Sequence, residues 1–152
     1  MITISRILVP TDLSDCATCA VRYGAELAAR FGAELVLLHV VPDTVLALPD
    51  AVMPAPAPLA DLQELRAAGR AGLAHLVAAL KLENRSPRAE VRLGSPGQEI
   101  VAAASDLHAD LVCIATHGRG GLSRVILGSV AEQVVRHAPC PVLTVRPDAC
   151  GR

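Results

Sequence analysis

Aromatic side chains are almost missing from this 152-residue chain, which has no tryptophan, one tyrosine and one phenylalanine. Proteins that bind single-stranded nucleic acid usually stack its bases on aromatic rings, and this chain lacks that surface. A formal net charge of -1 also argues against the polybasic face that a phosphate backbone requires. The composition therefore predicts no nucleic-acid partner.

Long apolar runs and an even set of cysteines are absent as well. No uncharged stretch is long enough to span a bilayer, and residues 1–10 lack the basic and apolar regions of a secretion signal. The chain has five cysteines, an odd number, which argues against a disulfide framework, and we expect them to be reduced. Together these features predict a cytoplasmic protein without a membrane segment.

Lysine occurs once, as Lys81, and so the Gly-Lys-Ser/Thr ending of a P-loop is missing. No Ser-His-Asp arrangement or cluster of carboxylates is evident either. Cys16 and Cys19 form a single Cys-x-x-Cys, which without a second pair is not a zinc site. We interpret these two cysteines as small residues at a helix–sheet contact. The pattern favours binding over catalysis.

Short apolar runs alternate with helical patterns along the chain. The expected strands are residues 6–10, 34–41, 88–93, 110–114 and 141–146, and the expected helices are residues 15–31, 59–82, 96–105 and 130–137. Residues 42–58 hold five prolines and predict a plain surface loop, although its place after a strand would suit a lid. We expect residues 1–147 to form one domain and residues 148–152 a short tail.

Five strands alternating with four helices predict an α/β fold, a doubly wound five-stranded parallel sheet with helices on both faces. We expect the strand order 3-2-1-4-5, which places the topological switch point between the first and fourth strands. Ligands of open α/β sheets bind at that point, outside the carboxyl ends of the strands. The loops that meet there are residues 10–12 and residues 115–129.

The second loop is rich in glycine and leads from a strand into a helix, which is the arrangement of a phosphate site. Its expected donors are the backbone beside Gly118, Gly120, Gly121 and Gly128, the side chains of Arg119 and Arg124, and the N–H groups of Ser129 and Val130. Asp12, on the first loop, would accept a hydrogen bond from a ribose hydroxyl or a base amine. The alternative is that the glycines only make a tight turn and Ser129 only caps its helix.

Two further patterns concern single residues. Ser129-Val130-Ala131-Glu132 has the spacing of a capping box, as does Ser95-Pro96-Gly97-Gln98, so each serine is expected to cap a helix. His39 and His117 end strands near the predicted crevice and could touch a ligand. The remaining histidines are expected at the surface, and they are His75, His108 and His137.

Several blocks resemble the universal stress protein family along essentially the whole chain. These blocks are residues 7–14, 38–40, 116–119, 127–132 and 139–145. ATP-binding members carry Gly-x2-Gly-x9-Gly-Ser/Thr, whose later part is matched by Gly118 and Gly128-Ser129. The first glycine of that motif is Ala115 here, which adds a methyl group where the backbone approaches the nucleotide.

The resemblance implies a dimeric protein that binds ATP with Mg²⁺ in stress response or signalling. It implies that Asp12 contacts ribose or base, that the Val40 main chain contacts adenine, and that residues of the second loop hold phosphates. The expected site comprises Pro10, Thr11, Asp12, Val40, Ala115, His117, Gly118, Arg119, Gly128, Ser129 and Val130. The homodimer is expected to pair through Val142, Leu143, Thr144 and Val145. The alternatives are a weak ATP hydrolase and a nucleotide-free dimeric interaction protein.

Overall fold

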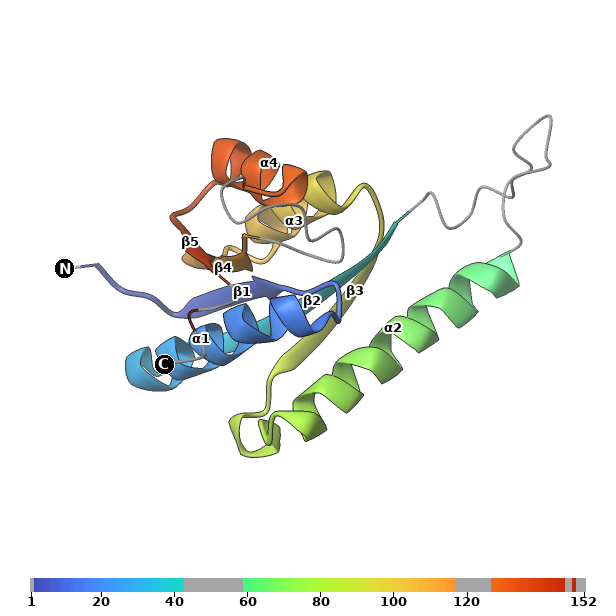
Figure 1. Ribbon diagram of the computed structural model, residues 1–152, viewed down its shortest axis with the longest axis horizontal. Coiled ribbons are helices and arrows are strands. Elements are labelled where there is room, and N and C mark those ends of the chain that lie inside the picture. Colours follow the sequence, from blue (N-terminus) through green and yellow to red (C-terminus); the bar gives the residue numbers. More distant parts are fainter. Residues whose placement is uncertain (1, 43–58, 117–126, 147–148, 150–152) are drawn as a thin grey trace.

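The computed structural model describes residues 2–42, 59–116, 127–146 and 149, and the following account concerns these residues. They form one parallel sheet in the order β3-β2-β1-β4-β5, as predicted (Figure 1). All four neighbouring pairs are parallel. The strands are β1 (Arg6–Pro10), β2 (Glu34–Pro42), β3 (Arg88–Gly94), β4 (Leu111–Ala115) and β5 (Val142–Val145).

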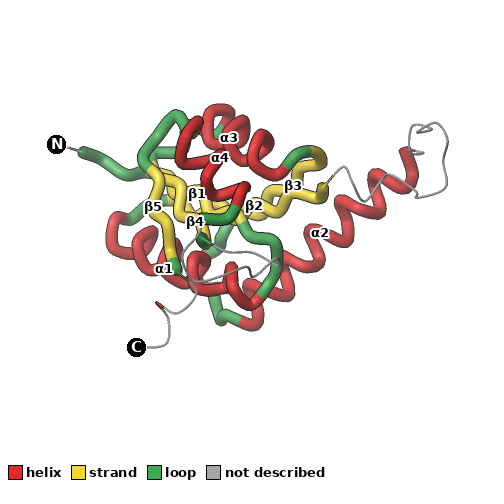
Figure 2. Tube along the Cα trace, turned by 45° about the horizontal axis from the view of Figure 1, so that its top comes forward, coloured by secondary structure: helices red, strands yellow, loops and turns green. Residues whose placement is uncertain are grey.

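Helices cover both faces of this sheet. Helices α1 and α2 lie on one face and α3 and α4 on the other, which Figures 1 and 2 show from two directions. The helices are α1 (Asp15–Phe31), α2 (Leu59–Ala79), α3 (Pro96–Asp106) and α4 (Ser129–His137), with a short 3-10 helix η2 (Glu83–Arg85) after α2. The predicted helix over residues 59–82 therefore ends earlier than expected.

Two separate cores explain why the central strands are apolar throughout. Ile7 and Val9 of β1 are buried in the core beneath α1 and α2, whereas Leu8, between them, is buried in the core beneath α3 and α4. Successive side chains of a strand point to opposite faces, so a strand covered on both sides must be apolar at every position. Full burial of such a side chain contributes roughly 1.5–3 kcal/mol.

Helix α1 follows the predicted boundaries because its caps are local. Ser14 precedes the helix in an extended conformation and its side chain accepts a hydrogen bond from the Ala17 N–H. Gly32 ends the helix with a φ of 64°, in the left-handed region that favours glycine. Within the helix, a Cβ at Gly24 would collide with the Val9 side chain, so this glycine lets α1 lie close to β1.

The two predicted capping boxes fare differently. Ser95 is the N-cap of α3 and Pro96 begins the helix, as predicted, but the Ser95 side chain makes no capping hydrogen bond. Ser129 is the first residue of α4 and not its cap, a place taken by Gly128. Glu132, the expected partner of Ser129, instead forms an ion pair at 2.9 Å with Arg136, which lies one turn later on the same helix. The spacing of a capping box does not decide which residue has the extended backbone of a cap.

The prediction that all cysteines are reduced is also wrong. Cys19 is disulfide-bonded, while Cys16, Cys113 and Cys140 are free thiols. An odd number of cysteines leaves at least one unpaired but does not exclude a single pair. Cys19 is buried in α1, which agrees with its predicted place at the helix–sheet contact.

Among the described residues, no helix is both long enough and apolar enough to cross a membrane. His75, His108 and His137 are exposed, as predicted. Of the predicted loop over residues 42–58, Pro42 is instead the last residue of β2, and residues 43–58 lie outside the described residues.

Candidate functional site

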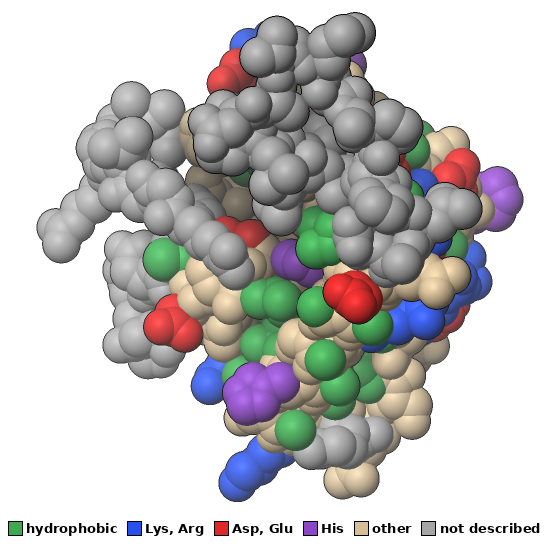
Figure 3. Space-filling model, turned by 90° about the vertical axis from the view of Figure 1, so that its right-hand side faces the viewer, with side chains coloured by type: hydrophobic (Ala, Val, Ile, Leu, Met, Phe, Trp, Pro, Cys, Tyr) green, Lys and Arg blue, Asp and Glu red, His purple; other side chains and the backbone are tan. Residues whose placement is uncertain are grey.

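The candidate site lies where the two central strands end. β1 and β4 are parallel neighbours, so Pro10 and Ala115, their last residues, are at the same edge of the sheet. From β1 the chain continues into α1 on one face, and from β4 it continues to α4 on the other face. Figure 3 views this edge of the molecule, where apolar, acidic and histidine side chains lie next to one another. The predicted switch point is confirmed.

Two threonines occupy equivalent places after these strands. Thr11 follows β1, Thr116 follows β4, and they are the buried polar residues of the part that the structure describes, with 6% and 8% exposed. The Thr11 N–H donates to the Leu38 carbonyl at 2.8 Å, and the Thr116 N–H donates to the Val145 carbonyl at 2.9 Å. Each threonine thus extends the sheet by one hydrogen bond at the edge where a ligand would bind.

Asp12 is held by a turn of its own loop. Its Oδ1 accepts hydrogen bonds from the Ser14 N–H at 3.0 Å and from the Ser14 hydroxyl at 2.5 Å. The Thr11 hydroxyl in turn accepts a hydrogen bond from the Leu13 N–H at 3.1 Å. Aspartate and threonine commonly close such turns with their side chains. The carboxylate is therefore fixed just before the N-terminus of α1.

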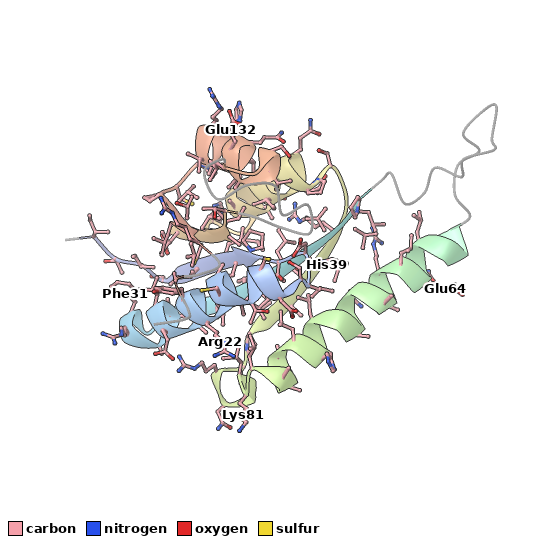
Figure 4. The ribbon with its side chains drawn as sticks, viewed as in Figure 1. Arg22, Phe31, His39, Glu64, Lys81 and Glu132 are labelled. Carbon is pink, nitrogen blue, oxygen red and sulfur yellow. The ribbon has the colours of Figure 1, made fainter. Side chains whose placement is uncertain are left out.

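His39 and Val40 reach this loop from β2, the neighbouring strand. His39 Nδ1 lies 2.9 Å from the Thr11 carbonyl oxygen, and since a carbonyl only accepts, Nδ1 carries the proton. Figure 4 labels His39 near the start of α1. The Val40 side chain is buried in the opposite core, beneath α3 and α4. Any contact of Val40 with a ligand at this edge would thus come from its main chain.

Gly128 closes the second loop by a backbone contact. Its N–H donates to the Thr116 carbonyl at 2.9 Å, and a Cβ built on Gly128 would lie 3.1 Å from the same oxygen. Glycine is therefore favoured here by the close approach of two backbone segments, whereas the sequence suggested the approach of a ligand. Thr116, the other half of this contact, was not among the predicted site residues. The signal that could have found it is a polar residue directly after a buried strand.

The N-terminus of α4 follows immediately. Gly128 is the cap, and no side chain caps the helix within the described residues. Ser129 is exposed and Val130 half-buried. The first N–H groups of a helix have no partner within it and carry the positive end of the helix dipole. This end of α4 is suited to receive an anion.

The remaining predicted positions divide into two groups. Pro10 is buried at the end of β1, and half-buried Ala115 ends β4, in register with Val145. The other predicted site residues lie outside the described residues, as do two glycines and an arginine of the same loop: His117, Gly118, Arg119, Gly120, Gly121 and Arg124. Within the described residues no three metal-binding side chains gather in one place.

Two of the free thiols are poor nucleophiles. Cys113 of β4 is fully buried beneath α1, and its Sγ donates to the Ala20 carbonyl at 3.4 Å. Burial raises the pKa of Cys113 from 9.0 to about 12. Burial, and to a lesser extent the Asp110 carboxylate, also raises the pKa of Cys140. Since the thiolate is the reactive form, these two cysteines give the site no nucleophile.

Fold and site together define a doubly wound α/β protein with polar groups at the switch point. The comparisons with known proteins make this more specific. Residues 3–146 match the model of the universal stress protein family, and the chain belongs to that family. It is 34% identical to the universal stress protein MJ0531 of Methanocaldococcus jannaschii over 142 residues, covering 93% of this chain and 81% of that protein.

Solved structures agree with this assignment. The universal stress protein UspA from Lactobacillus plantarum aligns with a TM-score of 0.70 and 31% identity, over 95% of this chain and 99% of that one. A universal stress protein from Archaeoglobus fulgidus in complex with dAMP has the same fold, with a TM-score of 0.58 and 24% identity, over 96% of this chain and 100% of that one.

Proposed function

We propose that this protein binds ATP, together with Mg²⁺, at the switch-point crevice and acts as a nucleotide-dependent module in stress response or signalling. One observation carries the proposal. A carboxylate fixed after β1 and a helix N-terminus after β4 to which no described side chain offers a capping hydrogen-bond acceptor follow adjacent strands at the carboxyl end of the sheet. A nucleotide presents hydroxyl and amine donors at one end and phosphates at the other, which matches this pair.

The roles follow from the chemistry of each group. Asp12 accepts hydrogen bonds from the ribose or the base, and the N–H groups of Ser129 and Val130 donate to phosphate oxygens. The main chain of Val40 contacts adenine, as family resemblance implies. Gly118, Arg119 and His117 add contacts from the part of the loop outside the described residues. The complex of the Archaeoglobus fulgidus relative with dAMP supports an adenine nucleotide as the ligand class.

Titration calorimetry of the purified protein with ATP and Mg²⁺ tests the proposal. We expect saturable binding of ATP, with weaker binding of AMP because fewer phosphates reach α4. GTP serves as the control for the base. The matched variant is Gly128→Asp, which brings a Cβ and a negative charge to the Thr116 carbonyl and should abolish the binding heat. Absence of heat from the wild-type protein at millimolar ATP would refute nucleotide binding.

We also propose a homodimer that pairs through β5, which is at the edge of the sheet. The N–H groups of Val112 on β4 and of Thr116, directly after β4, donate to the Pro141 and Val145 carbonyls. In a parallel ladder alternate residues face the same neighbour, so Pro141, Leu143 and Val145 face β4. The Thr144 N–H then points outward, toward the open edge.

This alternation selects the variant for the dimer test. Thr144→Pro removes an outward N–H and leaves the hydrogen bonds to β4 in place, whereas Leu143→Pro breaks the sheet itself. Light scattering should show twice the monomer mass for the wild type and the monomer mass for Thr144→Pro, with a similar melting temperature. A Thr144→Pro protein that remains a dimer would exclude pairing through β5. A cytoplasmic location, which we also propose, is tested by cell fractionation.

A further inference from the structure

Leu13, directly after Asp12, has an unusual backbone. Its φ is 64°, in the left-handed region that branched side chains rarely occupy. Such a conformation persists only where the surroundings hold it, and it often accompanies a functional site. The residue next to the proposed ligand-binding carboxylate is therefore held in place by something outside the turn.

Helix α2 supplies that support at Gly72. A Cβ on Gly72 would lie 2.5 Å from Leu13 Cδ1, and the Leu13 Cγ and Cδ2 atoms are also within 4 Å. The Leu13 side chain thus occupies the space that any other residue at position 72 would fill. Leu13 also packs against the core beneath α1 and α2. Its side chain is docked between the sheet and α2.

A second glycine of the same helix receives His39. A Cβ on Gly69 would lie 3.2 Å from His39 Cδ2 and 3.0 Å from Val91 Cγ1. Residues three apart share a face of a helix, so Gly69 and Gly72 present one surface to the sheet. His39 joins this surface to the loop, because its Nδ1 holds the Thr11 carbonyl at 2.9 Å. The Asp12 loop is braced at Thr11 through His39 and at Leu13 directly.

We infer that Leu13 and His39 are positioning residues for Asp12, and that the Gly69–Gly72 face of α2 is the surface against which they are held. The inference rests on the proposed function, since it assigns what fixes the carboxylate of that site. None of these residues needs to contact the nucleotide. Changes on α2 should therefore alter nucleotide affinity through the Asp12 loop.

Gly72→Ala is the first test. Alanine is a better helix former than glycine, so the melting temperature should not fall, yet its Cβ must displace Leu13. We expect ATP affinity to fall about tenfold. In a Leu13→Ala background the Leu13 atoms near Gly72 are absent, so Gly72→Ala should lower ATP affinity less than about twofold. Ala74→Gly, at an exposed position of α2, is the control and should leave affinity unchanged.

His39 is tested by a pair of variants. His39→Leu removes the donor to the Thr11 carbonyl and should weaken ATP binding about tenfold. His39→Asn places an amide N–H near the position of Nδ1 and should recover most of that loss. If His39 only filled space, the order would be reversed, because leucine is closer in volume to histidine than asparagine is.

Amide hydrogen exchange separates this inference from the proposed function. The Leu13 and Ser14 N–H groups donate to Thr11 Oγ1 and Asp12 Oδ1, so their exchange reports the loop without any nucleotide. We expect exchange about tenfold faster in Gly72→Ala and His39→Leu, and unchanged exchange in Ala74→Gly. If the wild type binds no ATP, the proposed function fails, and exchange alone decides whether the loop is braced. Unchanged exchange, or faster exchange with unchanged ATP affinity, would overturn the positioning role.

Discussion

The loops after β1 and β4 follow the carboxyl ends of adjacent strands but are held in different ways. The first is tied to β2 through Leu38 and His39, and it contacts α2 at Gly72. Its own side chains make three further hydrogen bonds around Asp12. In the described part of the second loop, the backbone contact between Thr116 and Gly128 joins the two ends, and no side chain caps α4.

This difference in how the two loops are held suggests that they contact different parts of the proposed nucleotide. The first loop presents its carboxylate in a geometry that exists before any ligand arrives, which lowers the ordering cost of binding. The second loop presents backbone N–H groups at a helix N-terminus, where, in the proposed function, a phosphate supplies the missing partner. Changes at the second loop should therefore affect phosphate binding most, and changes at the first loop should affect the ribose and base end.

The largest effect is expected at the backbone contact of the second loop. In Gly128→Val the Cβ lies 3.1 Å from the Thr116 carbonyl oxygen, as it does in Gly128→Ala, and the two methyl groups on the valine Cβ add bulk beside this backbone atom. Separating the two segments moves the N-terminus of α4, and calorimetry should show a loss of ATP affinity of about 100-fold or more. Gly128→Ala is the control, with a loss of a few fold. Equal affinity of Gly128→Val and wild type would mean that this contact does not shape the site.

A smaller loss is expected when the first loop loses its carboxylate. Asp12→Ala should weaken ATP binding about tenfold, or about 1.4 kcal/mol, the range for a hydrogen bond to a charged group. The loss should be smaller for a ligand without ribose, such as inorganic triphosphate. Because Asp12 also holds Ser14, the cap of α1, Ser14→Ala controls for the effect on the helix. A loss of the same size for triphosphate would contradict the division between the loops.

The core beneath both loops is tested separately, through Cys113 and pH. The folded protein keeps the Cys113 proton up to a pKa of about 12, whereas the unfolded chain releases it near 9.0. This group's contribution to stability is therefore complete below pH 9 and is lost as the pH rises toward 12. Urea unfolding should show the advantage of wild type over Cys113→Ala shrinking by up to about 1.4 kcal/mol per pH unit in that range.

Two observations would sharpen the test on Cys113. Val36→Ala, another fully buried strand residue without a titrating group, should keep the wild-type dependence on pH. ATP affinity of the Cys113→Ala protein at neutral pH should equal that of wild type, because the thiol faces α1 and not the crevice. A changed affinity would show that the core and the loops are not independent.

The smallest effect is expected at Ala115, where ATP-binding relatives carry glycine. Ala115 ends β4, is half-buried and lies in register with Val145, so its backbone already has a regular strand conformation. Ala115→Gly should change ATP affinity by no more than about threefold and lower stability by about 0.5–1 kcal/mol. Calorimetry and thermal unfolding measure the two quantities. A tenfold gain in affinity would show that the methyl group obstructs the nucleotide.

Much of the candidate site could be located from the sequence, because its position depends on strand order. Once the central strands were identified, Thr11, Asp12 and Gly128 had to lie beside their carboxyl ends, and the structure places them there. Their contacts with ATP stay predictions. Thr116 was missed because it contributes its backbone N–H and carbonyl groups, which do not depend on the residue type.

The sequence by itself determined the α/β class, the strand order and the caps of α1. Each depends on local chemistry: continuous apolar runs require burial on both faces, and Ser14 and Gly32 act on their own helix. Tertiary structure alone decided the cap of α4, the backbone of Leu13, the disulfide of Cys19 and the surface formed by Gly69 and Gly72. These features arise where segments that are distant in the sequence come into contact. The spacing of residues along the chain does not show which segments will do so.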